Sequence, residues 1–381
     1  MVIGGGIAGL SAAAALAAHG RVTVLEAEEA IGFHSSGRSA TMLHFALGDA
    51  VVRALTLAGR GFFEAPPGDL CDSPLARRMP MLVHARADEQ DALEELRQEI
   101  LPFAAPEQLD AAGVAALCPL LRTGARGAVA GIVDRNGLRL DPHALLHGYL
   151  RLLRAAGGTL VLGARANAIR RAGGTWEVET ERGGAFTAPV LVNAAGAWAE
   201  AVAGLAGVAP LGLRPLKRTI ITFDAPPGTD LTGWPFAKTV GDELYFAPEG
   251  GRLFASPMDE GPSDPCDTQP DEYEVALAAH RVEERLAMRV ERVIHRWAGL
   301  RTFAPDRRPV AGFADDADGF LWLAGQGGFG LQTAPMLARV AESLVAGTPW
   351  PIAEVAAADL APGRFLRQAA KIDPAVADEI E

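Results

Sequence analysis

The chain of 381 residues has few cysteines, no long apolar run and no excess of basic residues. Its three cysteines, Cys71, Cys118 and Cys266, lie far apart and form no CxxC pair. This spacing argues against a metal site or a redox motif and favours the reducing cytoplasm as the location. No apolar run approaches the roughly 20 residues of a membrane-spanning helix, so we expect no integral membrane segment. The net charge of −12 argues against nucleic acid and anionic membranes as main partners, since both attract basic surfaces.

The composition that is present is typical of a globular protein that stays in solution. Hydrophobic residues make up 49% and charged residues 22%, and the length suffices for one large domain or two ordinary ones. Residues 1–3 run directly into a glycine-rich turn, which is not the pattern of a signal peptide. The first strand is short, so a longer natural N-terminus stays open.

A strand–helix–strand unit opens the chain. Residues 2–3 end a strand, residues 7–19 form an Ala- and Leu-rich helix that stops at Gly20, and residues 21–26 form a second strand. This order predicts two parallel strands connected by the helix.

The turn between the first strand and the helix has the spacing G-x-G-x-x-G, at Gly4, Gly6 and Gly9. The first glycine permits a tight turn, the second lets the backbone approach a pyrophosphate, and the third lets the helix pack on the strand. The helix N-terminus offers free N–H groups to the phosphates. Glu26, at the end of the second strand, suits hydrogen bonds from a ribose. The sequence therefore predicts a dinucleotide site.

Two features favour FAD over NAD. The fingerprint begins at residue 4, and a second strand-to-helix junction lies far downstream at residues 190–198. Only one fingerprint is present, whereas an enzyme that passes electrons from NAD(P)H through a flavin needs a second nucleotide fold. We therefore expect the organic substrate to reduce the flavin directly.

The rest of the chain mixes two patterns. A helix is expected from Asp141 to about residue 156, followed by strands around Gly-Gly turns at 173–174 and 183–184. Residues 217–223 predict a strand and residues 243–256 a hairpin, which is antiparallel patterning inserted into an α/β chain. Residues 320–335 return to a strand, a glycine-rich turn and a helix start. The stretch 257–272 predicts a surface loop, and the charge run 281–292 an exposed helix.

These patterns predict an α/β fold, in which a Rossmann-type FAD-binding domain carries a discontinuous α+β substrate domain built on an antiparallel sheet. The expected FAD-binding domain comprises residues 1–75, 137–210 and 296–381. The expected substrate-binding domain comprises residues 76–136 and 211–295.

Six segments spread over nearly the whole chain carry a family resemblance: VIGGGIAG (2–9), GFHSSGRSA (32–40), VNAAGAW (192–198), PLKRTIITF (215–223), WAGLRTFAPD (297–306) and GQGGFGLQTAP (325–335). Together they resemble the D-amino acid oxidase / glycine oxidase family of flavoenzymes, and within it most resemble bacterial D-arginine dehydrogenase.

The resemblance implies how FAD is held. Residues 34–40 would wrap the flavin pyrophosphate, residues 194–196 would approach the nucleotide, and residues 327–331 would lie against the flavin ring, where free N–H groups at a helix N-terminus stabilise the reduced, anionic flavin. Covalently flavinylated relatives carry a Cys soon after the segment that holds Arg301, and none is present there, so we expect non-covalent FAD. The expected cofactor-binding residues are Gly4, Gly6, Ile7, Ala8, Gly9, Glu26, His34, Ser35, Arg38, Ser39, Ala40, Ala195, Gly196, Trp198, Gly299, Arg301, Gly327, Gly328, Phe329, Gly330, Leu331 and Gln332.

The substrate site is expected to depend on positioning. A carboxylate calls for Arg, whose fork binds both oxygens. Arg218 and Arg301 stand in otherwise apolar strand contexts, Tyr245 adds a hydroxyl, and the resemblance implies that these three bind the substrate carboxylate. The backbone C=O of Gly328 would accept from the substrate amine.

The departures from the D-arginine enzyme concern the side-chain pocket. Met42 and Leu47 stand where that enzyme has a His and a Tyr, and His44 is nearby but out of register. Pro80 stands where a glutamate would meet the guanidinium. A cationic side chain would then lack a buried counter-charge, at a cost of several kcal/mol. D-arginine is therefore not the expected best substrate.

The sequence thus predicts an FAD-dependent enzyme that oxidises the Cα–N bond of a D-amino acid with a neutral or apolar side chain. Hydride transfer to flavin N5 would leave an imino acid, which hydrolyses to a 2-oxo acid and ammonia. Alternatives stay open: a 2-hydroxy acid dehydrogenase with His44 as base, a sarcosine/glycine-type secondary amine oxidase, or a non-catalytic FAD-holding subunit. The electron acceptor is expected to be oxygen or a quinone, and the protein a monomer or homodimer.

Other conspicuous residues favour structural interpretations. His143 and His147, four residues apart on the expected helix, are more typical of a solvated helix face than of a metal site, and we predict no metal. Trp176, Trp198, Trp297 and Trp322 are expected in the core.

Overall fold

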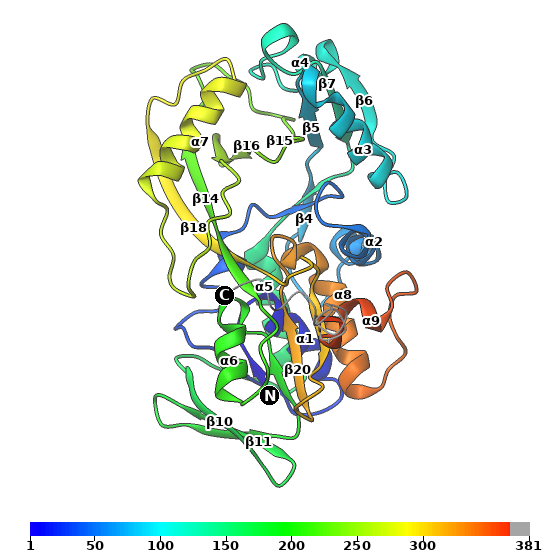
Figure 1. Cartoon of the computed structure of the whole chain (residues 1–381), viewed down its shortest axis with the longest axis vertical. Coiled ribbons are helices and arrows are strands. Elements are labelled where there is room, and N and C mark those ends of the chain that lie inside the picture. The colour runs from blue at the N-terminus through cyan, green and yellow to red at the C-terminus, as the bar shows by residue number, and fades with distance from the viewer. Residues whose placement is uncertain (366–381) are drawn as a thin grey trace, which may run out of the picture.

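The computed structural model describes residues 1–365 and has two large sheets, one in each half of Figure 1. The sheet in the lower half has the strand order β19-β20-β13-β1-β2-β9. Neighbouring strands are parallel except at the edge, where β19 runs antiparallel to β20. The bounds are β1 Val2–Ile3, β2 Thr23–Leu25, β9 Thr159–Val161, β13 Leu191–Asn193, β19 Val310–Phe313 and β20 Phe320–Ala324.

Helices from distant parts of the chain cover this sheet. Helix α1 (Ile7–Leu16) packs against α5 (Pro142–Ala155) and α8 (Gly330–Ala346), and α2 (Ala50–Glu64) packs on α8. Two shorter helices, α6 (Ala199–Leu205) and α9 (Ala357–Leu360), complete this half. Helix α1 is almost wholly apolar, which suits a helix enclosed between a sheet and two other helices.

The upper half is an eight-stranded mixed sheet in the order β18-β14-β17-β16-β15-β5-β7-β6. Helices α4 (Ala111–Leu117) and α7 (Glu272–Arg285) lie on one side of it, and α3 (Gln90–Ile100) on the other. The two long strands β14 and β18 pair antiparallel and run from this half toward the lower one (Figure 1). The bounds are β5 Met81–Ala85, β6 Glu107–Asp110, β7 Ala130–Asp134, β14 Arg214–Phe223, β15 Phe236–Thr239, β16 Tyr245–Glu249, β17 Arg252–Ser256 and β18 Val293–Phe303.

Two three-stranded sheets complete the fold. One combines β3 (Met42–Leu43), β8 (Leu138–Leu140) and β4 (Ala76–Arg78), and the other is the meander β10 (Ala166–Ala172), β11 (Thr175–Thr180) and β12 (Ala185–Ala188). In the first of these sheets β8 lies between β3 and β4 and pairs antiparallel with both, and β4 leads along the chain into β5 of the eight-stranded sheet.

The predicted fold class is confirmed, as are its main local elements. The opening strand–helix–strand unit is parallel, the Gly-Gly turns at 173–174 and 183–184 join β10 to β11 and β11 to β12, and residues 245–256 form the hairpin β16–β17. Asp141 caps α5 by accepting from the N–H of Ala144 at 2.8 Å. The division into two discontinuous domains stays a prediction.

Three expectations need correction. The helix expected over 281–292 ends at Arg285, which is buried rather than exposed and pairs with Glu243. The loop 257–272 is not wholly at the surface, because its first residues are drawn in by hydrogen bonds from Arg218 and Thr219 to Asp259. Trp198 and Trp297 are only partly buried, whereas Trp176 and Trp322 lie in the core as expected.

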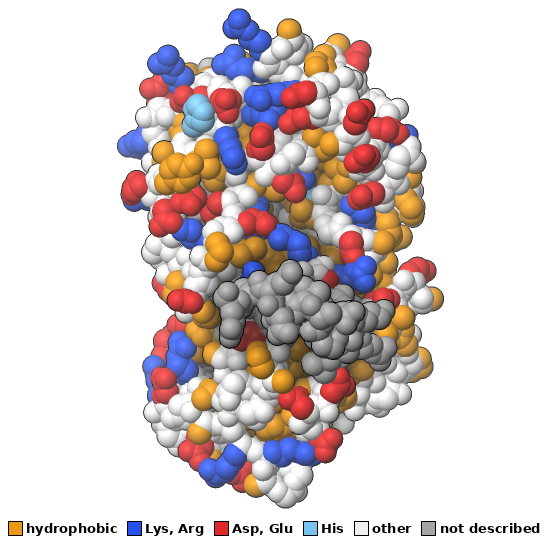
Figure 2. All heavy atoms as spheres, in the orientation of Figure 1, with side chains coloured by type: hydrophobic (Ala, Val, Ile, Leu, Met, Phe, Trp, Pro, Cys, Tyr) orange, Lys and Arg blue, Asp and Glu red, His pale blue; other side chains and the backbone are white. Residues whose placement is uncertain are grey.

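The charged side chains on the face seen in Figure 2 are of both signs. Figure 2 shows acidic and basic side chains interspersed on one face, with no large patch of a single sign. Among residues 1–365, no helix is both long and apolar enough to cross a bilayer.

Candidate cofactor and substrate site

Two adjoining cavities run between the sheets and the glycine-rich turn. The first encloses about 1260 Å³ and the second about 1050 Å³, each counted with its open mouth. They are continuous in their walls, because both are lined by Gly6, Ser35, Ser36, Ala194 and Gly196. The result is one elongated site with two ends, which is the shape a dinucleotide and a small substrate need together.

The second cavity is the end at which the sequence predicts the adenosine part of the dinucleotide. Glu26 lies in its wall, nearly buried, and its carboxylate accepts from the backbone N–H groups of Gly5 and Glu28. A carboxylate has about four acceptor positions, so Glu26 keeps capacity for ribose hydroxyls. Gly4 has φ +112°, and a Cβ there would stand 2.4 Å from the carbonyl oxygen of Ala194. Only glycine fits at this position.

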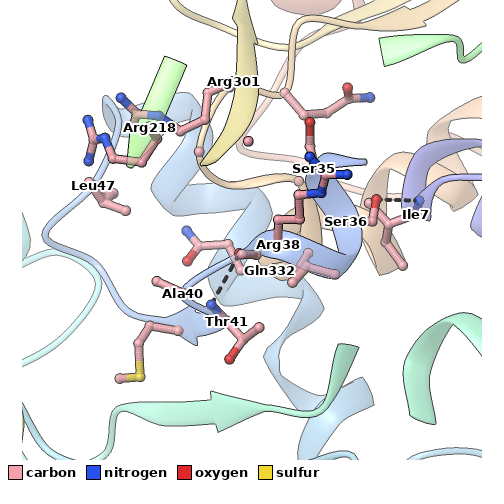
Figure 3. A pocket seen from close by; sticks show the side chains of 18 of the residues that line it. Ile7, Ser35, Ser36, Arg38, Ala40, Thr41, Leu47, Arg218, Arg301 and Gln332 are labelled. Atoms are coloured by element: carbon pink, nitrogen blue, oxygen red, sulfur yellow. Dashed lines mark hydrogen bonds between the residues drawn. The ribbon is translucent and has the colours of Figure 1, made fainter. Parts of the chain in front are cut away.

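The junction of the cavities contains the N-terminus of α1. Its N-cap, Gly6, has no side chain, and the N–H of Ile7 donates to Ser36 Oγ at 3.0 Å (Figure 3). Ser36 belongs to the short helix η1 (Ser35–Arg38), which lies across the helix end. Free N–H groups and a hydroxyl-rich turn at a positive helix end suit a pyrophosphate. Gly9 lies one turn further, where its close approach to Gly4 brings helix and strand together.

The first cavity has unsatisfied polar groups in its wall. Thr41 Oγ1, Thr302 Oγ1 and Gln326 Nε2 are buried and have no hydrogen-bond partner among the described residues. Buried polar atoms are normally paired, so these three indicate a polar partner that residues 1–365 do not supply. The N-terminus of α8 adjoins them at Gly330 and has no side-chain cap. The arrangement fits the polar edge of a flavin ring.

The far end of the same cavity collects the predicted carboxylate-binding residues. Arg218 from β14, Arg301 from β18 and Tyr245 from β16 all line it. Figure 3 shows the side chains of Arg218 and Arg301 close together, with Leu47 beside them. The Arg218 guanidinium lies 5.9 Å from the centre of the Tyr245 ring.

Electrostatics make this end a site for an anion. Burial and the neighbouring charge of Arg218 lower the pKa of Arg301 to about 10. The Nε of Arg301 is buried and has no partner among residues 1–365. Two close guanidinium groups with a free N–H are stabilised by a carboxylate between them.

The two arginines already have a carboxylate partner within the chain, Glu260. Glu260 Oε1 accepts from Arg301 Nη2 at 2.6 Å and from Arg218 Nη2 at 3.4 Å. Arg307 Nη2, which is half exposed, donates to the same oxygen at 2.9 Å. Burial favours a higher pKa for Glu260, but the hydrogen bond from Arg307 and the charge of Arg301 hold the pKa below its usual value. Glu260 therefore neutralises part of the charge of the arginines from beside the cavity, because it is not among the lining residues and its side chain is 36% exposed.

The pocket beside the arginines has an apolar wall that also contains two basic residues, His44 and Lys238. Met42, Leu47, Ile220 and Phe236 line it, together with His44. Burial, and then the charge of Lys238, lower the pKa of His44 to about 3, so its imidazole is neutral near pH 7. Pro80 is not in the lining, although its carbonyl accepts from the N–H of Phe236 at 2.9 Å.

Most residues singled out from the sequence meet in the two cavities. The first is lined by Gly6, Ile7, Ala8, Ser35, Arg38, Ser39, Ala40, Met42, His44, Leu47, Gly196, Arg218, Tyr245, Gly299, Arg301, Gly327, Gly328, Gly330, Leu331 and Gln332, and the second adds Gly4, Glu26, His34, Ala195 and Trp198. Gly9, Pro80 and Phe329 lie outside both linings. Phe329 instead packs in a small core with Val52 and Phe303.

The sequence reasoning missed Thr41, Thr302, Gln326, Lys238 and Glu260. The first three neighbour predicted residues, so each could have been found by extending the motif by one position. Lys238 and Glu260 had no such signal, because one sits in a short strand and the other in a loop expected at the surface. Within residues 1–365, no group of three or more His, Cys, Asp and Glu side chains could hold a metal ion.

A dinucleotide cradle joined to an arginine-lined pocket defines a flavin-dependent oxidoreductase. The comparisons with known proteins agree. The family model for DAO, described as FAD dependent oxidoreductase, matches residues 1–344, and the chain belongs to this family. It is accordingly an FAD-dependent flavoprotein.

Curated relatives match at low identity. Hydrogen cyanide synthase subunit HcnC of Pseudomonas aeruginosa is 27% identical over 230 residues, which is 60% of this chain and 53% of that protein. The tRNA 5-methylaminomethyl-2-thiouridine biosynthesis bifunctional protein MnmC of Maricaulis maris is 29% identical over 375 residues, 96% of this chain and 54% of that protein. The chain thus spans about half the length of the curated relatives it matches.

Solved structures share the fold over nearly the whole chain. L-α-glycerophosphate oxidase from Mycoplasma pneumoniae superposes with a TM-score of 0.83 at 17% identity, covering 92% of this chain and 96% of that one. Iminodiacetate oxidase from Chelativorans sp. BNC1 superposes with a TM-score of 0.80 at 22% sequence identity, covering 95% of this chain and 98% of that one. Glycine oxidase from Geobacillus kaustophilus superposes with a TM-score of 0.79 at 20% sequence identity, covering 91% of this chain and 94% of that one. At these identities the likeness concerns the fold alone.

Proposed function

We propose that the protein oxidises the Cα–N bond of an amino acid, in the first instance a D-amino acid, with FAD held non-covalently. The observation that carries this proposal is the pair Arg218 and Arg301, which lines the same cavity as the unsatisfied polar atoms at its flavin-type end. A substrate carboxylate placed between the guanidinium groups is held close to the cofactor. Structural neighbours named glycine oxidase and iminodiacetate oxidase act on amines that carry carboxylates, which supports the proposal.

The chain's own residues would bind and orient the substrate. Arg218 and Arg301 take the carboxylate, Tyr245 donates its hydroxyl, and the backbone C=O of Gly328 accepts from the amine. Bound FAD supplies the acceptor for the two electrons and the hydrogen that leave the Cα–H bond. The amine enters neutral, its proton having gone to solvent, and the resulting imine takes up water to give a 2-oxo acid and ammonia.

The side-chain pocket favours substrates without a positive charge. The sequence predicted a neutral or apolar side chain from Met42, Leu47 and Pro80. Met42 and Leu47 line the cavity, Pro80 does not, and Ile220 and Phe236 extend the apolar wall. Lys238, in the same wall, makes a cationic side chain such as that of D-arginine the least favourable case. The prediction of a neutral or apolar side chain did not take Lys238 into account.

Oxidation of a 2-hydroxy acid is the second candidate, since His44 lies in the cavity and the glycerophosphate oxidase shares the fold. It would need His44 as a general base, and a pKa of about 3 makes that imidazole a weak one. An anaerobic screen separates the candidates. We expect bleaching of the flavin absorbance by amino acids, and faster bleaching by D- than by L-enantiomers. Bleaching by 2-hydroxy acids but by no amino acid or sarcosine would overturn the proposal.

A further inference from the structure

Lys238 is a buried basic residue that the proposed reaction does not use. It is the third residue of β15, its exposed fraction is 3%, and it lines the cavity that also contains Arg218 and Arg301. Lysine is almost never fully buried without a partner, because removing an ammonium group from water is costly. A lysine in the wall of a ligand cavity therefore calls for an explanation.

The strand register places Lys238 beside the proposed carboxylate site. In the antiparallel pair β15–β16, Lys238 is directly opposite Tyr245. Residues directly opposite each other have their side chains on the same face, with Cβ atoms about 5 Å apart. Phe236, two residues earlier, shares that face, and its ring lies 5.1 Å from that of Tyr245 and 5.9 Å from that of His44. Lys238 thus continues the substrate wall rather than the sheet's opposite face.

The counter-charge of Lys238 is weak. Its Nζ contacts Asp242 Oδ1, but the Asp242 side chain is 61% exposed, in the turn after β15. Because the Asp242 carboxylate is largely hydrated, water screens its attraction for the buried lysine. The ammonium group has three donors, so the pair leaves capacity for another acceptor. The nearby His44 is neutral, and Glu260 is already shared among three arginines.

We propose that Lys238 binds a second carboxylate of the substrate, so that the preferred substrates are acidic amino acids. This inference rests on the proposed function: Arg218 and Arg301 hold the α-carboxylate, and Lys238 holds the carboxylate of the side chain. The apolar residues Ile220 and Phe236 line the same cavity and could contact the substrate's methylene groups. The site thereby discriminates against the neutral amides of the same size.

The test compares substrates that differ only in this charge. We expect kcat/KM for D-glutamate to exceed that for D-glutamine by tenfold or more. The L-enantiomers of both, and D-aspartate compared with D-asparagine, are measured in the same way. In Lys238→Met the preference should fall at least tenfold, through a higher KM for the acid. Lys217→Met is the matched control, because Lys217 is also largely buried and also pairs with an exposed aspartate, Asp271, but lies outside the cavity. The control should keep the preference.

A binding measurement separates this inference from the proposed function. Titration of the visible flavin spectrum with glutarate and with its monoamide gives two dissociation constants without turnover. We expect the dianion to bind at least tenfold more tightly, and that advantage to be lost in Lys238→Met and kept in Lys217→Met. If no amino acid reduces the flavin but this binding pattern holds, the proposed function fails and the role of Lys238 stands.

Equal use of the acid and its amide by the wild-type enzyme would overturn the inference while leaving amino acid oxidation intact. The same conclusion follows if Lys238→Met keeps the preference, since the lysine stem would then only fill the wall while its amino group pairs with Asp242. Should Lys238→Met fold poorly, Lys238→Arg provides the complementary test, because it retains the charge and should retain the preference for the acid.

Discussion

The two ends of the elongated cavity are built by different means. The end predicted to hold the adenosine includes the backbone turn with Gly4 and Gly6, the N-terminus of α1, and one carboxylate, Glu26. The substrate end is formed by long side chains from β14, β15, β16 and β18. A backbone site needs residues that are close in sequence, whereas a side-chain site needs strands that pair in space. The difference explains why one end is visible as a motif and the other is not.

The largest effect that would sharpen this comparison concerns the backbone end. Gly4→Ala should abolish FAD retention, because its Cβ would meet the Ala194 carbonyl oxygen at 2.4 Å and φ is +112°. Gly20→Ala is the matched control, since its Cβ meets nothing within 4 Å. The measurement is the ratio of flavin to protein absorbance after purification. Full flavin content in Gly4→Ala would show that this turn is not the nucleotide cradle.

The next effect concerns the substrate end alone. Arg301→Met should reduce kcat/KM for the best amino acid by a hundred- to a thousandfold, since removing one partner of a buried ion pair typically costs about 3–5 kcal/mol. FAD content should stay normal, which separates this variant from Gly4→Ala. Arg307→Met, at a half-exposed position on the same carboxylate, is expected to have a much smaller effect. Normal turnover by Arg301→Met would break the assignment of the anion site.

A third prediction lies away from both ends, at His84 in β5. Its imidazole is buried without a hydrogen-bond partner among the described residues, and burial, with the charge of Arg285, lowers its pKa to about 3. Between this value and about 6.5 the unfolded chain binds a proton that the folded protein does not, so stability falls as the pH drops. His84→Leu should remove about 1.4 kcal/mol of this loss per pH unit, or about 2 kcal/mol at pH 5.

Urea unfolding of wild type and His84→Leu at pH 7 and pH 5 checks this expectation. The two proteins should differ little in their pH 7 stability but clearly at pH 5. An identical pH dependence of the two proteins would show that His84 can be protonated in the folded state.

The smallest effect tests whether Glu260 competes with the substrate. Glu260→Gln should lower KM for a carboxylate substrate by about three- to tenfold, or up to about 1.4 kcal/mol, because the arginines lose an internal anion. Steady-state kinetics and the spectral titration with glutarate both report it. A higher KM would mean that Glu260 instead orients the two guanidinium groups.

The local fold around the glycine-rich turn could be predicted from the sequence, whereas nucleotide binding by these residues stays a prediction. Gly4, Gly6, Gly9 and Glu26 lie within 26 residues, and the strand–helix–strand order fixes how they meet. Arg218, Tyr245 and Arg301 were recognised through the resemblance, and the structure brings them into one cavity. Pro80 was expected in the pocket from the alignment of a loop, but it lies outside the lining, and its carbonyl accepts from the N–H of Phe236.

What the sequence by itself determined is therefore the backbone architecture: the α/β class, the dinucleotide turn, and the family of flavoenzymes. Only the tertiary structure decided the charge of the substrate pocket. Lys238 lines it because β15 pairs with β16 so that Lys238 faces Tyr245, and Glu260 reaches the arginines from beside the cavity because Asp259 anchors the loop to β14. The position of Lys238 depends on strand register, since a one-residue shift of the strand would turn it to the opposite face of the sheet.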